Sequence, residues 1–183
     1  MAALIVCRNT ESTVIPVRAS QAWSIIRQLN FQSLMPTSVE SCSMIVPENS
    51  MGTHALVQTE TVRFEDMRYR TVVLDENAMT PFVCGAAVGS LRRVVYKDGA
   101  EFVFRIVEIS DVQRVVAYEL IETDATVNVS SVLHTIQVHE VTETGETFLS
   151  WTTEFSGDCD QHVFSDAKFK KLDAFKDFRN VLK

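Results

Sequence analysis

The sequence DQHVFSDAKFKKLDAFKDFRNVL, residues 160–182, decides the fold. An acidic residue among Asp158 to Asp160 can cap a helix that runs to Leu182. On a helical wheel the apolar side chains of this helix fall within about a third of a turn; they are Val163, Phe164, Ala167, Ala174, Phe175, Phe178, Val181 and Leu182. A long helix with one apolar face has to lie on other apolar surface. The rest of the chain must therefore supply an apolar layer.

Strand signals dominate the residues that precede this helix. Gly89–Tyr96 and Glu101–Ile109 flank Lys97-Asp98-Gly99, and Asp-Gly is a strong hairpin turn. The predicted meander continues through three more strands, the last two joined around Thr144-Gly145; these are Val115–Ile121, Val127–Val138 and Thr147–Phe155.

The N-terminal part holds shorter elements. Ser12–Val17 is predicted as a strand, and Pro16 indicates an edge position because proline cannot donate to a neighbouring strand. Ser20 can cap a helix that follows, and Pro36 ends a second short helical piece. Ser41–Val46 is the next predicted strand.

Length and composition fit one domain that spans residues 1–183. The chain is 46% hydrophobic and 22% charged, as in a globular protein with a core. Its net charge of −7 argues against nucleic acid or an anionic membrane surface as the main partner. No apolar stretch approaches the roughly 20 residues of a membrane span, so no integral membrane association is expected. Without a visible secretory signal, we expect a cytoplasmic protein whose four cysteines are reduced.

The predicted fold class is α+β: a curved antiparallel sheet wrapped around a long C-terminal helix, with two short helices after the first strand. Sheet and helix in such an arrangement meet along their seams, which often leaves an internal cavity between them. The pattern alone is equally compatible with a solid core that has no cavity.

Several segments resemble the START-like, pollen-allergen-like superfamily. TVIPVRASQAW, residues 13–23, resembles its opening strand and the "pa..vW" helix that follows. VGSLRRVVYKDG, residues 88–99, resembles the "vGsvR.v...dG" hairpin of polyketide cyclase/dehydrase-like members and of plant abscisic-acid receptors. Three further strands match in order: Phe104–Ile109, Val116–Ile121 and Thr147–Phe155. The resemblance covers nearly the whole chain and implies a helix-grip fold with an internal cavity for a small hydrophobic molecule.

Two departures from the resemblance matter. Residues 47–84 are longer than in compact members, and Thr53–Phe64 with Tyr69–Leu74 could form an inserted hairpin through Glu65-Asp66. This segment could cover the cavity mouth, extend the sheet or mediate a homodimer. Pro36 stands where the resemblance would place the acid-binding lysine of the receptors, and Asp124-Ala-Thr126 replaces their latch residues. These differences argue against hormone reception.

The resemblance also sets a strand register, and alternation then assigns side chains to the face toward the helix. That face is mostly apolar with a few polar groups, which is the composition of a small-molecule pocket. It comprises Phe102, Phe104, Tyr118, Leu120, Ser130, Val132, His134, Ser150 and Glu154; the last helix would add Lys171, Phe175 and Phe178.

His134 is the candidate catalytic residue, with Tyr118 as its partner. A histidine titrates near neutrality, so an inward His134 beside Tyr118 or Glu154 could act as general base or acid. The alternative is a core histidine that is hydrogen-bonded to a neighbour and tunes ligand polarity. Lys171 could pair with a ligand carboxylate, but a lysine in this position more often extends its stem to water.

The sequence contains no recognisable cofactor or metal-binding motif. No Gly-rich phosphate loop, nucleophile elbow or metal-ligand spacing is present, so no cofactor and no metal site are predicted. Three hypotheses follow: a carrier or sensor of a lipid-like, aromatic or polyketide-like molecule; a cofactor-independent cyclase or dehydratase; and an interaction module that works through the inserted hairpin. The first is favoured.

Overall fold

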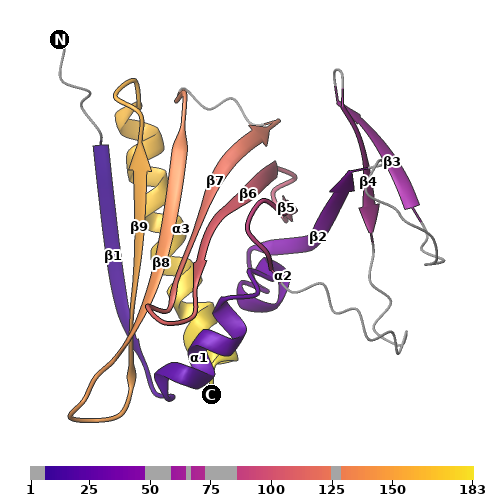
Figure 1. Cartoon of the computed structure of the whole chain (residues 1–183). Helices are drawn as coiled ribbons and strands as arrows, with labels where there is room; N and C mark the ends of the chain where they lie inside the picture. The colour runs from indigo at the N-terminus through magenta and orange to yellow at the C-terminus, as the bar shows by residue number, and fades with distance from the viewer. Residues whose placement is uncertain (1–6, 48–58, 65–66, 73–85, 125–128) are drawn as a thin grey trace.

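The computed structural model describes residues 7–47, 59–64, 67–72, 86–124 and 129–183. In these ranges a curved antiparallel sheet wraps around the long C-terminal helix (Figure 1), which confirms the predicted fold class. The elements in chain order are β1 (Cys7–Ile15), α1 (Ala19–Ile26), α2 (Phe31–Leu34), β2 (Val39–Pro47), β3 (Thr59–Phe64), β4 (Met67–Val72), β5 (Leu91–Tyr96), β6 (Glu101–Ser110), β7 (Val115–Thr123), β8 (Val132–Glu140), β9 (Thr147–Phe155) and α3 (Gln161–Val181).

The sheet has the order β1-β9-β8-β7-β6-β5-β2-β4-β3, and each neighbouring pair is antiparallel. Strands β5 to β9 form the predicted meander, while β1 pairs beyond β9 and β2 pairs beyond β5. β1 therefore lies at an edge of the sheet, as Pro16 directly after it indicated. Irregularities in register interrupt the β6–β7 and β2–β5 pairs. Such bulges increase the local bend and twist of a strand, in keeping with the curvature of the sheet.

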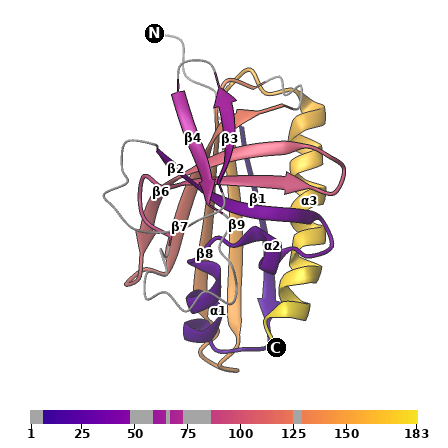
Figure 2. The same cartoon turned by 90° about the vertical axis from the view of Figure 1, so that its right-hand side faces the viewer.

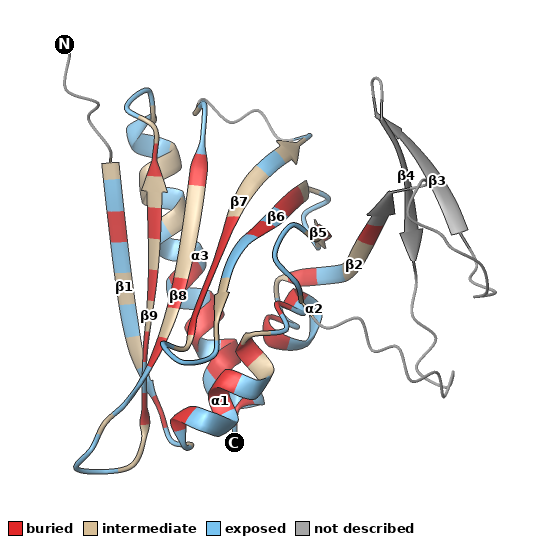
Figure 3. Cartoon of the chain, in the orientation of Figure 1, coloured by how far each residue is buried: buried red, intermediate tan, exposed pale blue. Residues whose placement is uncertain are grey.

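α3 runs along one face of this sheet (Figure 2). Its start is capped as predicted, since the side chain of Asp160 accepts a hydrogen bond of 2.9 Å from the backbone N–H of His162. The second half of α3 is packed into the core through Ala174, Phe175 and Phe178. Residues 161–170, by contrast, include no buried residue. Figure 3 shows the same division, with burial concentrated near α1, α2 and the C-terminal end of α3. The first half of α3 therefore leaves space between helix and sheet.

Several of the predicted elements begin elsewhere than expected. β1 begins at Cys7, five residues before the predicted Ser12. α1 begins at Ala19 with Arg18 at its N-cap and no side-chain cap, so the prediction that Ser20 caps this helix is wrong. β8 begins at Val132, five residues later than predicted. Residues 125–128, which include most of the predicted latch replacement, lie outside the described residues.

The β5–β6 hairpin turns where Asp98-Gly99 predicted. Gly99 has φ of +90°, a left-handed conformation that costs a glycine little because it lacks Cβ. The Asp98 carboxylate accepts a hydrogen bond of 3.0 Å from the N–H of Ala100. This turn places Tyr96 and Phe102 opposite each other at the end of the hairpin, with ring centroids 5.3 Å apart.

The segment 47–84 contributes β3 and β4 to the sheet. These strands pair with each other as a hairpin, Phe64 opposite Met67, and β4 pairs with β2. Of the roles considered for this segment, the described strands extend the sheet; its remaining residues, 48–58, 65–66 and 73–84, lie outside the described ranges. Within the part of the chain that the structure describes, no helix is both long and apolar enough to cross a membrane.

Candidate functional site

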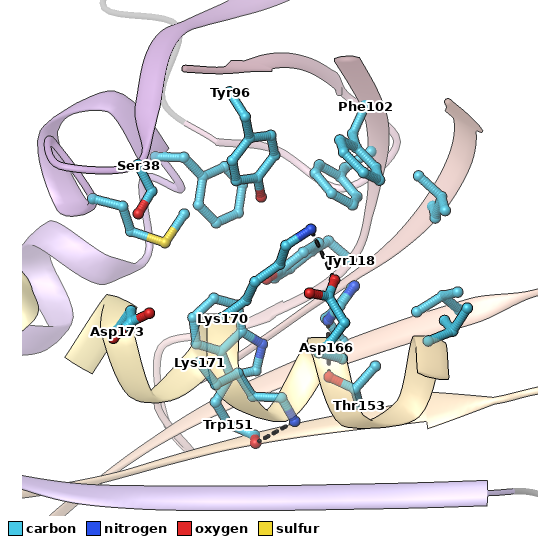
Figure 4. Close-up of a pocket in the computed structure, with 18 of the residues that line it drawn as sticks. Ser38, Tyr96, Phe102, Tyr118, Trp151, Thr153, Asp166, Lys170, Lys171 and Asp173 are labelled. Atoms are coloured by element: carbon cyan, nitrogen blue, oxygen red, sulfur yellow. Dashed lines mark hydrogen bonds and ion pairs between the residues drawn. The ribbon is translucent and has the colours of Figure 1, made fainter. Parts of the chain in front are cut away.

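A cavity of about 480 Å³ lies between the sheet and the first half of α3 (Figure 4). This volume falls within the few hundred to about 1,000 Å³ of small-molecule sites. The lining combines aromatic and aliphatic side chains of the sheet with polar side chains of α3 and the β5–β6 turn. Among the lining residues are Phe31, Met35, Tyr96, Phe102, Phe104, Tyr118, Leu120, Val132, His134, Trp151, Thr153, Phe155, Asp166, Ala167, Lys170 and Lys171.

Phe104 lies at the centre of a continuous aromatic wall. Its ring centroid is 5.3 Å from that of Tyr118, 5.8 Å from that of His134 and 5.9 Å from that of Phe31. The ring of Phe102 stacks parallel to it at 6.0 Å. Edge-to-face and offset pairs of this kind each add about 0.5–1.5 kcal/mol beyond the burial of their area. The wall is therefore a preformed apolar surface with planar faces.

His134 lies within this wall. Its imidazole stacks on the phenol of Tyr118, with centroids 4.8 Å apart and 17° between the rings, and its Nδ1 is 3.1 Å from the hydroxyl oxygen of buried Thr153. Burial, and secondly the positive charge of Lys171, lower the pKa of His134 to about 3. The imidazole is therefore neutral at neutral pH. A group whose pKa lies so far from the working pH is a poor general acid or base, and its stacked contact with Tyr118 provides no proton path between them.

Tyr118 and Trp151 bring two hydrogen-bond donors to the same region. Burial raises the pKa of Tyr118 well above its ordinary value, Tyr96 raises it further, and the indole N–H of Trp151 acts in the opposite direction. The phenol is therefore protonated at neutral pH. Within the described residues, the buried Nε1 of Trp151 has no acceptor with full hydrogen-bond geometry. An unsatisfied buried donor costs about 1–3 kcal/mol, so a group that accepts from it would be stabilising.

Lys171 lines the cavity, as predicted, but its side chain does not extend into water, so that alternative is wrong. The residue is only 3% exposed. Its ammonium donates to the main-chain oxygen of Asn9 at 2.8 Å, to the side-chain oxygen of Asn9 at 2.6 Å and to the main-chain oxygen of Trp151 at 3.3 Å. These three bonds use all three N–H donors of a lysine. Burial lowers the pKa of Lys171 to about 8, and Glu11 opposes this effect.

Lys170, the next residue, lies at the rim of the cavity and was missed from the sequence. Its Nζ is 2.9 Å from Asp166 Oδ2 and lies 5.9 Å from the ring centroid of Tyr96 and 6.0 Å from that of Phe102. In Figure 4 its side chain extends from α3 toward these two rings. The contact combines an ion pair within the helix with cation–π attraction, each worth up to about 1 kcal/mol at an exposed site.

Six residues predicted from strand alternation do line the cavity together: Phe102, Phe104, Tyr118, Leu120, Val132 and His134. The assignment of Ser150 and Glu154 to the same face is wrong. In β9 the buried residues are Thr147, Leu149, Trp151, Thr153 and Phe155. Side chains alternate with a period of two, so a register that is off by one residue moves every side chain to the opposite face. Glu154 instead forms an ion pair with Arg8 on β1.

Three further predicted lining residues are also placed elsewhere. Ser130 precedes β8, is exposed, and donates its hydroxyl to Asp158. Phe175 and Phe178 are buried in the core beyond the cavity, where both pack on Trp151, with centroids 6.3 Å and 6.0 Å from its ring. Their position on the helical wheel was right, but a wheel does not tell how far along the helix the cavity extends.

Trp151, Thr153 and Phe155 were also missed, and the sequence held a signal for two of them. Leu149, Trp151 and Phe155 occupy odd positions of one strand, and this spacing alone indicates that the odd face of β9 is the buried one. In the described residues, no three His, Cys, Asp or Glu side chains gather closely enough to hold a metal ion.

No family model matches this chain, and no curated protein matches its sequence. Solved structures do share its fold. A protein from Nitrosospira multiformis superposes with a TM-score of 0.66 at 16% identity, with 97% of both chains covered. Ara h 8.0201 does so with a TM-score of 0.61 at 14% identity, covering 97% of this chain and 98% of that chain. Ginseng major latex-like protein 151 from Panax ginseng has a TM-score of 0.62 at 13% identity, covering 96% and 97%. The resemblance to pollen-allergen-like proteins is thus confirmed at the level of the helix-grip fold.

Proposed function

We propose that this helix-grip protein binds a small hydrophobic molecule in the cavity between its sheet and α3, as a carrier or sensor. The observation that carries the proposal is the aromatic wall around Phe104, which faces a space of about 480 Å³. A solid core would fill this space at crystal-like density. Burial of an apolar ligand there would contribute about 25 cal/mol for each Å² of apolar area, before the costs of association.

The state of the polar groups supports binding over catalysis. His134, the candidate general base, has its pKa lowered to about 3 and is held by Thr153. A base with so low a pKa is too weak to remove a proton from a substrate efficiently at neutral pH. A neutral imidazole that lines a cavity can instead offer one hydrogen bond to a ligand. The cyclase or dehydratase hypothesis therefore gains no support from the geometry. The interaction-module hypothesis, which concerns the β3–β4 hairpin, is a separate question that the cavity does not address.

The proposal is tested with the full-length protein in two measurements. Native and denatured mass spectra of the purified protein are compared for a small molecule that co-purifies. Nile red, an uncharged dye that fluoresces in apolar surroundings, is then titrated into the wild type and into two tryptophan variants. Leu120→Trp places a large side chain in the cavity, whereas Ile121→Trp is the matched control because Ile121 is 46% exposed and lies next to it on β7.

We expect the wild type and Ile121→Trp to bind the dye with similar Kd values. Leu120→Trp should weaken binding by about tenfold or more, because the added side chain occupies ligand volume and an overpacked site costs about 1–3 kcal/mol. Equal affinity of Leu120→Trp and Ile121→Trp would place the dye outside the cavity. If the protein neither carries a small molecule nor binds the dye, the proposal is wrong.

A further inference from the structure

We infer that the ligand carries an uncharged oxygen acceptor on a largely aromatic skeleton, and that Tyr118 Oη, His134 and Trp151 Nε1 form the site that binds this oxygen. We call these three groups the polar pole of the cavity. The inference rests on the proposed function, which it makes more specific: it states what kind of hydrophobic molecule the cavity selects.

The first argument is that the indole N–H of the polar pole has no acceptor in full hydrogen-bond geometry among the described residues. Trp151 is 6% exposed, and its Nε1 is buried without a hydrogen-bond partner among the described residues. The indole N–H acts on the phenol of Tyr118 as a hydrogen-bond donor and lowers its pKa, although the pair does not reach full hydrogen-bond geometry. An indole nitrogen can only donate, so Trp151 cannot accept the phenolic proton of Tyr118. One ligand oxygen, with two lone pairs, could accept from both groups.

The second argument comes from His134, which adjoins both donors. Its ring centroid lies 4.8 Å from that of Tyr118 and 6.3 Å from that of Trp151. Its Nδ1 is bonded to Thr153, which leaves Nε2 as the ring nitrogen that a ligand could meet. Because a neutral imidazole offers either a donor or an acceptor at this nitrogen, depending on the tautomer, the pole accepts a carbonyl or a hydroxyl oxygen.

The third argument concerns charge, and it excludes a carboxylate. Of the two lysines that line the cavity, Lys171 already uses its three donors on oxygens of Asn9 and Trp151, and Lys170 pairs with Asp166. His134 is neutral, since its pKa is about 3. A carboxylate at the pole would be buried without a free counter-ion, and an unpaired buried charge costs far more than an unpaired dipole. The oxygen is therefore an uncharged one.

The aromatic wall indicates what kind of carbon skeleton the ligand has. The rings of Phe104, Phe102 and Tyr118 line the cavity, with Phe102 parallel to Phe104 and Tyr118 nearly perpendicular to it. Aromatic ligands gain energy beyond area burial through offset-stacked or edge-to-face contacts with such rings. A planar ring system with one carbonyl oxygen thus satisfies both the wall and the pole.

The test compares fluorenone with fluorene, two rigid aromatic compounds that differ by one carbonyl oxygen. Their Kd values are measured by quenching of tryptophan fluorescence in the wild type, Tyr118→Phe and Tyr96→Phe. Tyr118→Phe removes only the hydroxyl of the pole. Tyr96→Phe is the matched control, because Tyr96 is another cavity tyrosine, at the β5–β6 hairpin, and its hydroxyl is not one of the three groups of the pole. The ratio of the two Kd values within each variant cancels differences in packing and stability.

We expect Tyr118→Phe to lower the preference for fluorenone over fluorene by about fivefold, as one neutral hydrogen bond would, and to leave fluorene binding unchanged. Tyr96→Phe should keep the wild-type preference. The infrared carbonyl stretch of bound fluorenone should lie at lower frequency in the wild type than in Tyr118→Phe, a shift that a structural role of the tyrosine would not produce. Fluorenone carboxylate should bind more weakly than fluorenone.

Three results would overturn the inference while leaving the proposed function intact. They are an unchanged preference and carbonyl frequency in Tyr118→Phe, an equal loss in Tyr96→Phe, and tighter binding of the carboxylate than of fluorenone. Failure of both compounds to bind, together with an empty native mass spectrum and no dye binding, would instead reject the proposed function itself.

Discussion

The ammonium nitrogen of Lys171 lies 2.6 Å from the side-chain oxygen of Asn9, a residue 162 positions earlier in the chain. This contact joins the middle of α3 to the edge strand β1, inside the protein. Both residues are buried, Lys171 at 3% and Asn9 at 5% exposure. The charge has no carboxylate in hydrogen-bond contact among the described residues; it donates to neutral oxygens, and Glu11 stabilises it at longer range.

Asn9→Ala should lower the free energy of unfolding by about 2 kcal/mol, because a hydrogen bond to a buried charge contributes about 1.5–3 kcal/mol. Urea denaturation at pH 7 measures the change. Ser12→Ala, an exposed substitution on the same strand, should stay within about 0.5 kcal/mol of the wild type. In the background of Lys171→Met the cost of Asn9→Ala should shrink, since no ammonium then requires the amide oxygen. Fully additive costs would show that the two side chains are not coupled.

Thr37→Val should destabilise the protein by about 2 kcal/mol. The carboxylate of Asp177, 3% exposed on α3, accepts hydrogen bonds from the Thr37 N–H at 3.0 Å and from its hydroxyl at 2.5 Å. Valine keeps the shape of threonine but removes the hydroxyl, and hydrogen bonds to charged groups are about twice as strong as neutral ones. Thermal and urea denaturation measure the effect, and Thr142→Val, an exposed position in the turn after β8, is the control. A change below about 0.5 kcal/mol for Thr37→Val would contradict the assignment.

His134 should make the protein less stable in acid. Its folded pKa of about 3 lies below the ordinary 6.5, so between these values the unfolded state binds more protons than the folded state. Stability therefore rises with pH across this window and falls on acidification. Between pH 6.5 and 4.5 the wild type should lose on the order of 2 kcal/mol more than His134→Phe, which has no proton to bind. Urea denaturation at both pH values measures these free energies of unfolding. Equal losses of stability in the two proteins would mean that burial does not keep His134 neutral.

Lys170→Ala should open the cavity mouth to a neutral ligand. The side chain of Lys170 lies against Tyr96 and Phe102 at the rim and pairs with Asp166. Without this side chain, association and dissociation of fluorenone should both accelerate by about threefold, while Kd changes little. The lost cation–π contact of about 0.5–1 kcal/mol lowers the free-energy barrier between the free and the bound ligand, and this barrier is crossed in both directions. Stopped-flow fluorescence measures the rates. Lys168→Ala, whose ammonium lies on the other side of α3 at 4.0 Å from Glu11, should leave them unchanged; an equal acceleration there would point to a general charge effect.

The sequence by itself determined the order of the elements and much of the architecture. The Asp98-Gly99 turn, the Asp160 cap and the strand at Thr147–Phe155 all depend on neighbouring residues, so short-range patterns suffice to locate them. The apolar stripe of α3 likewise required a layer to pack on. Six lining residues followed from alternation along β6, β7 and β8.

The tertiary structure alone decided which residues meet at the cavity and in what state. A one-residue error in the predicted register of β9 assigned Ser150 and Glu154 to the wrong face and left out Trp151 and Thr153. Side chains of a strand alternate between two faces, so such an error exchanges the faces of all of them. The division of α3 into a cavity half and a core half depends on packing against distant segments, which separates Lys170 from Phe178. Protonation also depends on surroundings that no local pattern contains: His134 is neutral because burial removes water and places Lys171 nearby.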